Sequence, residues 1–329
     1  MFDPFIDRLL AHDSFLVVTH TRPDGDAVGS QLALAHFLRE EGKRVYALGS
    51  DHTPRNLAWM DPRNQIEVFD RDPSQFIRIG EVDAVVVVDA NALHRVGPLE
   101  ATLAEHRGTR FVIDHHPDPQ PVFDHMLVDT ERSSTGEIVF EMFEHRGLER
   151  LSPAAAEALY VAILTDTGSF RFSTVTPRVH EIAAKLIALG SLAPEEIHNN
   201  VYKTKSLAGQ HLLGLSLGSL QLYFGDKVGI MTITKPMLDR TGAHTEEAEG
   251  FTDHILAIEG VEVAVLAMQV ADHVKLSFRS QGDVPVNRLA ASLGGGGHFN
   301  ASGAFVRGSL DSVIKRLLDG VEDLVPSGA

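Results

Sequence analysis

The feature that most constrains the fold is the apolar run VDAVVVV at residues 82–88. β-Branched residues fill consecutive positions in this run, whereas a half-buried strand would alternate apolar and polar residues. Such a run is typical of a parallel strand that is buried on both faces, so the sequence predicts a sheet covered by helices on both sides. Asp89 follows the run directly and is therefore expected at the carboxyl end of a central strand.

Strand and helix patterns alternate through the rest of the first half. We expect strands at 15–19, 43–48, 66–69 and 110–113, and helices at 1–13, 27–41, 56–60 and 99–106. This alternation predicts an α/β fold built on a doubly wound parallel sheet. After residue 125 the pattern becomes helical, and Ser134 and Glu137 have the spacing of a capping box. Ser152 and Thr176, each followed by proline, suit the starts of two further helices.

The texture changes again near residue 220. Strands are expected at 228–233, 261–270, 274–278 and 304–306, and helices at 245–258, 285–293 and 310–318. Because the helices and strands of this part do not alternate strictly, we expect a smaller α+β domain. The predicted organisation is a larger domain over 1–190, a helical linker over 191–218 and a smaller domain over 219–329.

Composition limits the partners. The chain has 329 residues, a formal net charge of −16 and no cysteine, which excludes a disulfide framework and a thiolate metal site. The N-terminal sequence MFDPFIDRLL lacks the basic start and apolar core of a signal peptide, and no apolar run is long enough to span a bilayer. We therefore expect a cytoplasmic protein without a membrane partner. The negative charge argues against a long nucleic-acid track, which usually needs a basic surface.

Metal-ligand residues gather where the first strand gives way to a helix, in VVTHTRPDGDAVGS at residues 17–30. Asp24 and Asp26 stand close together near His20, and two such carboxylates repel each other unless a cation neutralises them. Oxygen and nitrogen ligands of this kind suit Mn²⁺ or Mg²⁺. Gly25 is expected to take a positive φ that lets both aspartates converge. An acidic loop that caps a helix would explain Asp24 and Asp26 equally well, but it would leave His20 unexplained.

Two other strands end in residues of the same type. Asp89 follows the central strand, and the next strand runs into Asp114, His115 and His116. Asp89 alone would be interpreted as a helix cap, and the paired histidines as a polar loop. Ligands of open α/β sheets bind beyond the carboxyl ends of the strands, however, so these residues and His20 are expected to meet at one edge. Asp166 lies at a helix C-terminus, where the helix dipole disfavours a carboxylate unless a cation compensates.

The segments HTRPDGDAVGS, VDAN, DHH and LTDTGSF resemble, in order and spacing, the four motifs of the DHH phosphoesterase superfamily. The segment GGGGHFNASG resembles the glycine-rich motif of the DHH-associated C-terminal domain, and the nearest group is the nano-RNase and 3′-phosphoadenosine-5′-phosphate phosphatase family. The resemblance implies two Mn²⁺ ions, with Mg²⁺ or Co²⁺ as substitutes. It implies that His20 and Asp24 bind one ion, that Asp26, His115 and Asp166 bind the other, and that Asp89 bridges them. His116 would face the phosphate, and Asp114 would orient its neighbours.

The second domain is expected to select the substrate. The glycines at 294–297, among them Gly295, Gly296 and Gly297, would let backbone N–H groups approach a phosphate, and His298 and Arg279 are candidate contacts. Arg95, just beyond Asp89, is a candidate phosphate clamp. The alternatives are a plain flexible loop for the glycines, an ordinary exposed strand residue for Arg279 and an exposed helix charge for Arg95.

The resemblance implies a Mn²⁺-dependent phosphodiesterase that degrades very short oligoribonucleotides to mononucleotides and removes phosphate from 3′-phosphoadenosine 5′-phosphate. Cleavage of cyclic di-AMP or a linear dinucleotide is the alternative. A RecJ-type exonuclease is expected to be longer and more positively charged, and a family II pyrophosphatase is not expected to carry GGGGH. A non-catalytic nucleotide sensor would need a damaged metal site. The oligomeric state is left open, with a homodimer as one option.

Overall fold

The computed structural model describes residues 2–297 and 299–321. The chain divides into two compact units, Met1–Thr204 and Lys205–Ala329. The division falls inside the segment 191–218, which contains the helices α8 (Pro194–Tyr202) and α9 (Leu207–Leu217). α8 belongs to the first unit and α9 to the second.

The first unit contains a parallel sheet of six strands in the order β3-β2-β1-β4-β5-β6. The strands are β1 (Ser14–Val18), β2 (Arg44–Gly49), β3 (Ile66–Val68), β4 (Ala84–Val88), β5 (Thr109–Asp114) and β6 (His125–Val128). The chain order reverses between β1 and β4, which makes that point the switch point of a doubly wound sheet. The predicted α/β class is thereby confirmed.

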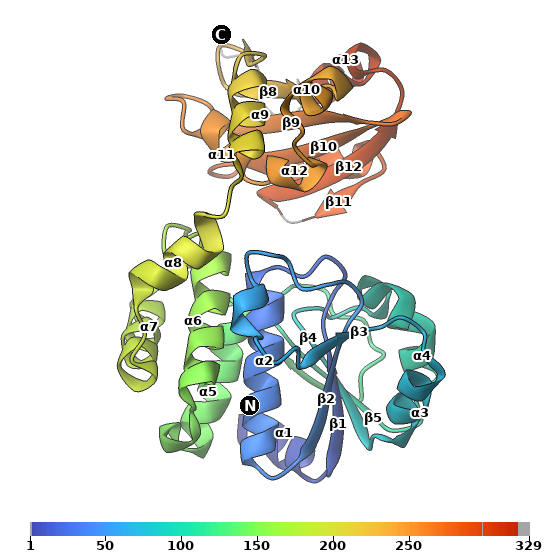
Figure 1. The fold of residues 1–329 in the computed structure, drawn as a ribbon, viewed down its shortest axis with the longest axis vertical. Coiled ribbons are helices and arrows are strands. Elements are labelled where there is room, and N and C mark those ends of the chain that lie inside the picture. The colour runs from blue at the N-terminus through green and yellow to red at the C-terminus, as the bar shows by residue number, and fades with distance from the viewer. Residues whose placement is uncertain (1, 298, 322–329) are drawn as a thin grey trace. The chain divides into compact units, whose positions relative to one another are not determined.

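Helices cover both faces of this sheet (Figure 1). They are α1 (Phe2–Leu10), α2 (Gly25–Glu40), α3 (Pro73–Glu81), α4 (Glu100–Ala104), α5 (Thr135–Arg146), α6 (Pro153–Asp166) and α7 (Pro177–Gly190), with 3₁₀ turns η1 (Ala58–Met60), η2 (Leu93–Leu99) and η3 (Leu148–Arg150). Val86 and Val88 of β4 join the core cluster formed with α1, α2, α5, α6 and α7. Val85 and Val87 join the cluster on the opposite face, which includes residues of α3 and α4. The unbroken valine run therefore serves two cores.

The three predicted helix caps are present, but the side chain of Glu137 has a different hydrogen-bond partner from the one a capping box predicts. The hydroxyls of Ser134, Ser152 and Thr176 accept hydrogen bonds from the first turns of α5, α6 and α7. Glu137 does not return its side chain to Ser134, as a capping box would require. Its carboxylate instead accepts from the backbone N–H of Ser133 at 2.8 Å and from the Ser133 hydroxyl at 2.7 Å.

Two local predictions are wrong, and one helix is not predicted. The strand β6 forms where the sequence predicts the helical region to begin, and helix α3 lies in a segment for which the sequence pattern predicts no element. Gly25 does not take a positive φ, since it is the first residue of α2 and is not among the glycines in that conformation. A Cβ atom at Gly25 would lie 2.4 Å from the Thr165 hydroxyl, so the glycine is needed for close packing of α2 on the end of α6.

The second unit contains a mixed sheet in the order β11-β12-β10-β9-β8-β7, in which only β8 and β9 pair in parallel among the described residues. Its strands are β7 (Gln221–Tyr223), β8 (Val228–Ile233), β9 (Val263–Val270), β10 (His273–Ser280), β11 (Gly296–Gly297) and β12 (Ala301–Arg307). Its further helices are α10 (Lys235–Thr241), η4 (Thr245–Ala248), α11 (Phe251–Leu256), α12 (Val286–Ser292) and α13 (Leu310–Val321).

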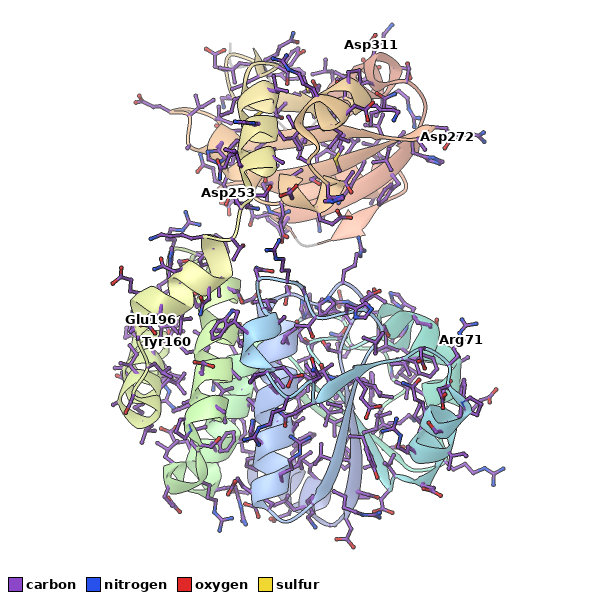
Figure 2. All side chains as sticks on the ribbon, viewed as in Figure 1. Arg71, Tyr160, Glu196, Asp253, Asp272 and Asp311 are labelled. Carbon is purple, nitrogen blue, oxygen red and sulfur yellow. The ribbon has the colours of Figure 1, made fainter. Side chains whose placement is uncertain are left out.

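The predicted hairpin between β9 and β10 is present, and Asp272 lies at its end (Figure 2). The alternative of a plain loop for the glycine run is wrong for Gly296 and Gly297, which form the edge strand β11 against Gly303 and Ser302. In the part of the chain that the structure describes, no helix is long and apolar enough to cross a membrane.

Candidate metal centre

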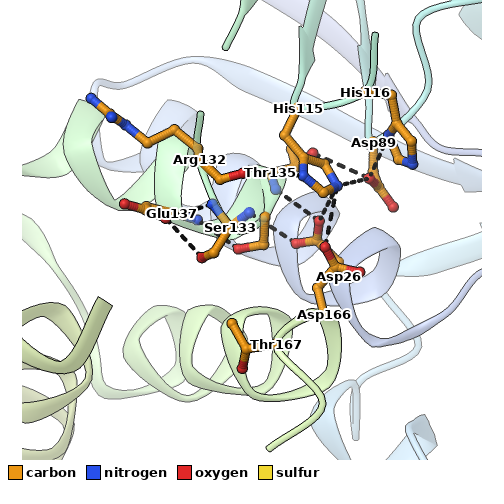
Figure 3. Close-up of polar contacts among 12 residues, drawn as sticks. Asp26, Asp89, His115, His116, Arg132, Ser133, Thr135, Glu137, Asp166 and Thr167 are labelled. Carbon is orange, nitrogen blue, oxygen red and sulfur yellow. Dashed lines mark hydrogen bonds and ion pairs between the residues drawn. The ribbon is translucent and has the colours of Figure 1, made fainter. Parts of the chain in front are cut away.

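The predicted ligands from three neighbouring strands meet at the switch point of the first sheet. Figure 3 shows Asp89, His115 and His116 of this cluster. His20 lies two residues beyond β1, Asp89 directly follows β4, and Asp114 is the last residue of β5. The strands β1, β4 and β5 are adjacent and parallel, so their carboxyl ends share one edge. Asp89 has a φ of 55°, a left-handed conformation that turns the chain sharply after the buried strand.

His20, Asp24 and Asp89 form one group that could hold a metal ion. Nδ1 of His20 lies 2.8 Å from the carbonyl oxygen of Thr21, which can only accept, so Nδ1 carries the proton. The other ring nitrogen, Nε2, is 3.3 Å from Oδ2 of Asp89. Asp24 also caps α2 by accepting from Ala27 N–H at 3.0 Å, so the helix-cap interpretation of this residue is compatible with a place in the metal group.

Asp26, His115 and Asp166 form a second group of the same kind. Nε2 of His115 is 3.2 Å from Oδ2 of Asp166 and 3.9 Å from Oδ2 of Asp26. The Nδ1 atom of His115 faces the carbonyl oxygen of Arg132 at 3.4 Å, an arrangement that places the ring proton on Nδ1. Asp166 is the last residue of α6, as the sequence predicts for a carboxylate at a helix C-terminus.

Asp89 also joins a third group with His115 and His116. Its Oδ1 atom lies 3.8 Å from Nε2 of His115 and 3.6 Å from Nδ1 of His116. Asp114 is fully buried, and its Oδ1 atom accepts from Nδ1 of His116 at 2.7 Å and from the backbone N–H of His115 at 2.8 Å. Asp114 therefore orients both residues that follow it.

Burial and neighbouring charges shift the pKa values of several carboxyl groups in the cluster. Burial raises the pKa of Asp26, and it raises the pKa of Asp89 well above the usual range, with a further rise from Asp26 and Asp24. Burial and then Asp26 and Asp24 also raise the pKa of Asp166 well above its usual range. For Asp114 burial acts in the same direction, but the His116 hydrogen bond and the histidine charges outweigh it and lower the pKa. Burial lowers the pKa of His115, which favours the neutral ring.

These observations fit a divalent metal better than a bare hydrogen-bond network. The Nε2 atom of His115 is buried and makes no hydrogen bond within the described residues, although carboxylate oxygens surround it. A neutral ring with its proton on Nδ1 turns the Nε2 lone pair toward those oxygens, which is repulsive unless a cation lies between them. Imidazole nitrogens fixed in this way by a carbonyl oxygen are typical of metal-ligating histidines.

Helix α5 supplies contacts to the cluster that the sequence does not predict. Both oxygens of Asp26 accept from its first turn, at 2.7 Å from Thr135 N–H and 2.9 Å from Gly136 N–H. The Thr135 hydroxyl donates to Oδ1 of Asp89 at 3.2 Å. In the sequence, Thr135 and Gly136 stand out only because they follow the helix cap Ser134. That position does not predict a contact with aspartates so distant in sequence.

The predicted substrate contacts come from both units: Arg95 belongs to the first unit, and Arg279 and the glycine run belong to the second. Arg95 lies in η2, where its carbonyl oxygen accepts from the N–H of Thr21, the residue after His20. Arg279 is an exposed residue of β10, and its guanidinium donates to the carbonyl oxygen of Phe278 at 3.0 Å.

Two glycines of the run at 294–297 lie where backbone segments approach closely, whereas an added Cβ at Gly296 would have no atom within 4 Å. A Cβ atom at Gly295 would lie 2.0 Å from the Gly303 carbonyl oxygen, and one at Gly297 would lie 2.6 Å from the Ala301 carbonyl oxygen. Gly296 and Gly297 are exposed along the edge strand β11. His298 lies outside the described residues.

Family models match both parts of the chain. The model of the DHH family, N-terminal domain, matches residues 14–163, and the model of the DHHA1 domain matches residues 225–326. The chain is 32% identical to the bifunctional oligoribonuclease and PAP phosphatase NrnA of Thermus thermophilus, covering 95% of this chain and 90% of that protein. It is 30% identical to the protein of the same name from Bacillus subtilis, covering 92% of each.

Two solved structures match this chain over nearly its whole length. An exopolyphosphatase-related protein from Bacteroides fragilis is 30% identical, has a TM-score of 0.93, and is matched over 98% of this chain and 97% of that chain. RecJ from Thermus thermophilus in complex with Mn²⁺ shares the fold, with a TM-score of 0.52 and 16% identity over 99% of this chain and 54% of that chain. The chain belongs to the DHH family of phosphoester hydrolases and carries a DHHA1 domain after its DHH domain.

Proposed function

We propose that this protein is a two-metal phosphoesterase that hydrolyses very short oligoribonucleotides to mononucleotides and also dephosphorylates 3′-phosphoadenosine 5′-phosphate. The observation that carries the proposal is the pair of ligand groups around Asp89, in a chain whose curated relatives are named for these two activities. His20 and Asp24 would hold one Mn²⁺ ion, Asp26, His115 and Asp166 the other, and Asp89 both.

The charge of the cluster supports two ions rather than one. Asp24, Asp26, Asp89 and Asp166 would together carry four negative charges when ionised, which two divalent cations balance. The oxygen and nitrogen donors suit Mn²⁺, Mg²⁺ or Co²⁺. When bound, two such ions would supply Lewis-acid activation of water and of the phosphoryl oxygens.

His116 is the proposed group that acts on the phosphate. The ionised carboxylate of Asp114 accepts from Nδ1 of His116, which fixes the plane of the ring and places a proton on Nδ1. When Nε2 also carries a proton, a ring held in this way can stabilise negative charge on the phosphoryl oxygens or give that proton to the leaving oxygen. Arg95, Arg279, the glycines Gly295–Gly297 and His298 are the proposed contacts to the rest of the substrate.

A side-by-side turnover assay tests the proposal. The purified protein with Mn²⁺ is given an RNA dinucleotide, a linear and a cyclic di-adenosine dinucleotide, 3′-phosphoadenosine 5′-phosphate and pyrophosphate. We expect the RNA dinucleotide and 3′-phosphoadenosine 5′-phosphate to be turned over, and pyrophosphate to be inert because a family II pyrophosphatase is not expected to carry the GGGGH segment of this chain. Preferred cleavage of the cyclic dinucleotide would favour the alternative activity. Binding of nucleotides without any turnover would favour a sensor.

A further inference from the structure

Thr135 contacts two of the candidate metal ligands through two different groups (Figure 3). Its backbone N–H donates to Oδ2 of Asp26 at 2.7 Å, and its hydroxyl donates to Oδ1 of Asp89 at 3.2 Å. Asp26 belongs to α2 and Asp89 follows β4, so this one residue of α5 connects ligands from two separate elements. Thr135 is fully buried, which keeps water from competing for either contact.

The neighbours of Thr135 complete the hold on Asp26. Gly136 N–H donates to Oδ1 of Asp26 at 2.9 Å, and the hydroxyl of Ser30 donates to the same oxygen at 3.0 Å. Oδ2 of Asp26, which accepts from Thr135, also lies 3.9 Å from Nε2 of His115. The carboxylate is therefore fixed in position by donors that stand apart from the groups proposed to bind metal.

The Thr135 hydroxyl is not needed to cap α5. The cap is Ser134, whose hydroxyl accepts from the N–H of Glu137 at 3.1 Å. A threonine that served only the helix would bond to a backbone group of its own first turn, whereas this hydroxyl donates to a carboxylate that is 46 residues away in sequence. Its position is thus explained by Asp89 rather than by the helix.

We propose that Thr135 is a positioning residue that holds Asp89 and Asp26 in the arrangement that binds metal. Carboxylates packed this closely repel each other and would otherwise rotate apart when no cation is present. A neutral donor that holds the ionised form in place lowers the reorganisation needed when the metal enters, and such outer contacts are worth about 10- to 100-fold in metal affinity. The inference rests on the proposed metal assignment.

The test compares Thr135→Val, which removes the hydroxyl at nearly constant shape, with Thr135→Ser, which keeps it. Mn²⁺ is titrated into metal-free full-length protein by calorimetry, and thermal unfolding is followed with and without Mn²⁺. We expect the valine variant to bind Mn²⁺ about 10- to 100-fold more weakly and the serine variant to stay within about threefold of wild type. Circular dichroism of the metal-free variants checks the fold. Excess Mn²⁺ should restore kcat in the valine variant, because no group that touches the substrate has been removed.

Three results would contradict the proposal or the metal assignment on which it rests. Wild-type affinity in Thr135→Val would refute it, and so would equal weakening in the serine and valine variants, which would point to shape rather than to the hydroxyl. If the valine variant does not fold, Thr135→Ala replaces it in the same comparison with serine. A wild-type protein that binds no Mn²⁺ would instead refute the metal assignment itself and the positioning role with it.

Discussion

Asp89 is the residue on which the charge balance of the cluster depends. Burial and the neighbouring aspartates raise its pKa well above the usual range in the folded state, whereas an unfolded chain gives it an ordinary value near 4. A raised carboxyl pKa destabilises the fold progressively as the pH rises from the unfolded value toward the folded one, and the full cost applies above both. Metal-free protein should therefore carry this cost at pH 7, and bound cations should remove it.

We predict that Asp89→Asn raises the melting temperature of the metal-free protein at pH 7 while abolishing the stabilisation by Mn²⁺. Asparagine tolerates the left-handed φ of 55° at this position, so the change adds no backbone strain. A gain of about 3 °C or more is expected, given about 2–4 °C per kcal/mol for a domain of this size. Trp59, the single tryptophan, reports unfolding of the first unit by fluorescence.

The same melts well below pH 4 provide the control, because there the carboxyl is protonated in both the folded and the unfolded state and the wild-type and variant curves should coincide. Elemental analysis should find both ions lost together from Asp89→Asn. Retention of two tightly bound ions would contradict the bridging assignment.

The two adjacent histidines should separate metal binding from chemistry. His115 faces three carboxylates through Nε2, so His115→Ala should lower both metal content and turnover. His116 is held by Asp114, and His116→Ala should reduce kcat about 100-fold or more at nearly normal metal content. Metal content and single-turnover rates decide the matter. A metal-poor His116→Ala protein would show that this histidine is a ligand, a role that its grouping with Asp89 and His115 permits.

At the scale of elements, the strongly patterned segments could be predicted and the weakly patterned ones could not. The run at 82–88 predicts a strand buried on both faces, and β4 begins within it and ends at Val88 as expected. By contrast, β6 is a four-residue strand at the edge of the sheet, and an apolar run as short as its Met-Leu-Val does not distinguish a strand from a helix. Helix α3 does carry a signal, since Asp72 caps it and Pro73 begins it, but the segment after the cap is too polar and short to predict a helix alone.

The candidate site divides in the same way. His20, Asp89 and Asp114 follow strands that the sequence predicts, and sheet topology then brings them together. The donation from Gly136 N–H to Asp26 links residues 110 apart in sequence, and it depends on how α2 and α5 pack. Local patterns carry no information on such packing, which is why Thr135 and Gly136 are not predicted for the site.

We predict that Gly136→Ala destabilises the first unit and weakens Mn²⁺ binding together. A Cβ atom here would lie 2.5 Å from Cβ of Ala162 on α6 and 3.3 Å from Oδ1 of Asp26, so α5 must move away from both. Overpacking of this kind costs about 1–3 kcal/mol. Urea unfolding followed by Trp59 fluorescence measures the loss, and calorimetry measures the metal affinity.

Gly80→Ala is the matched control in the same unit. Gly80 is an exposed residue of α3 with no atom within 4 Å of an added Cβ. Alanine there should leave metal binding unchanged and stabilise the helix by up to about 1 kcal/mol. Equal effects from the two substitutions would show that Gly136 has no special relation to the cluster.

On the scale of the whole molecule, the charge of the chain limits the kind of substrate. A net charge of −16 leaves little basis for a continuous cationic track, and phosphate contacts along a long chain are what give strong binding to long nucleic acid. The cluster that would attract a phosphate is confined to one edge of one sheet. A substrate with few phosphates suits this distribution better than a polymer.

We therefore predict that single-turnover rates fall steeply as RNA lengthens beyond about five nucleotides, a length set by the limited size expected of a small-ligand site. Labelled RNAs of increasing length, each with saturating Mn²⁺, measure this directly. Arg279→Ala should mainly raise KM and weaken the length preference, because Arg279 is a proposed contact to the part of the substrate remote from the reacting phosphorus. His115→Ala, in contrast, should lower the rate at every length. Equal rates on dinucleotides and long RNA would refute the short-substrate proposal and favour a processive exonuclease, and that enzyme should also lose activity sharply as salt is raised.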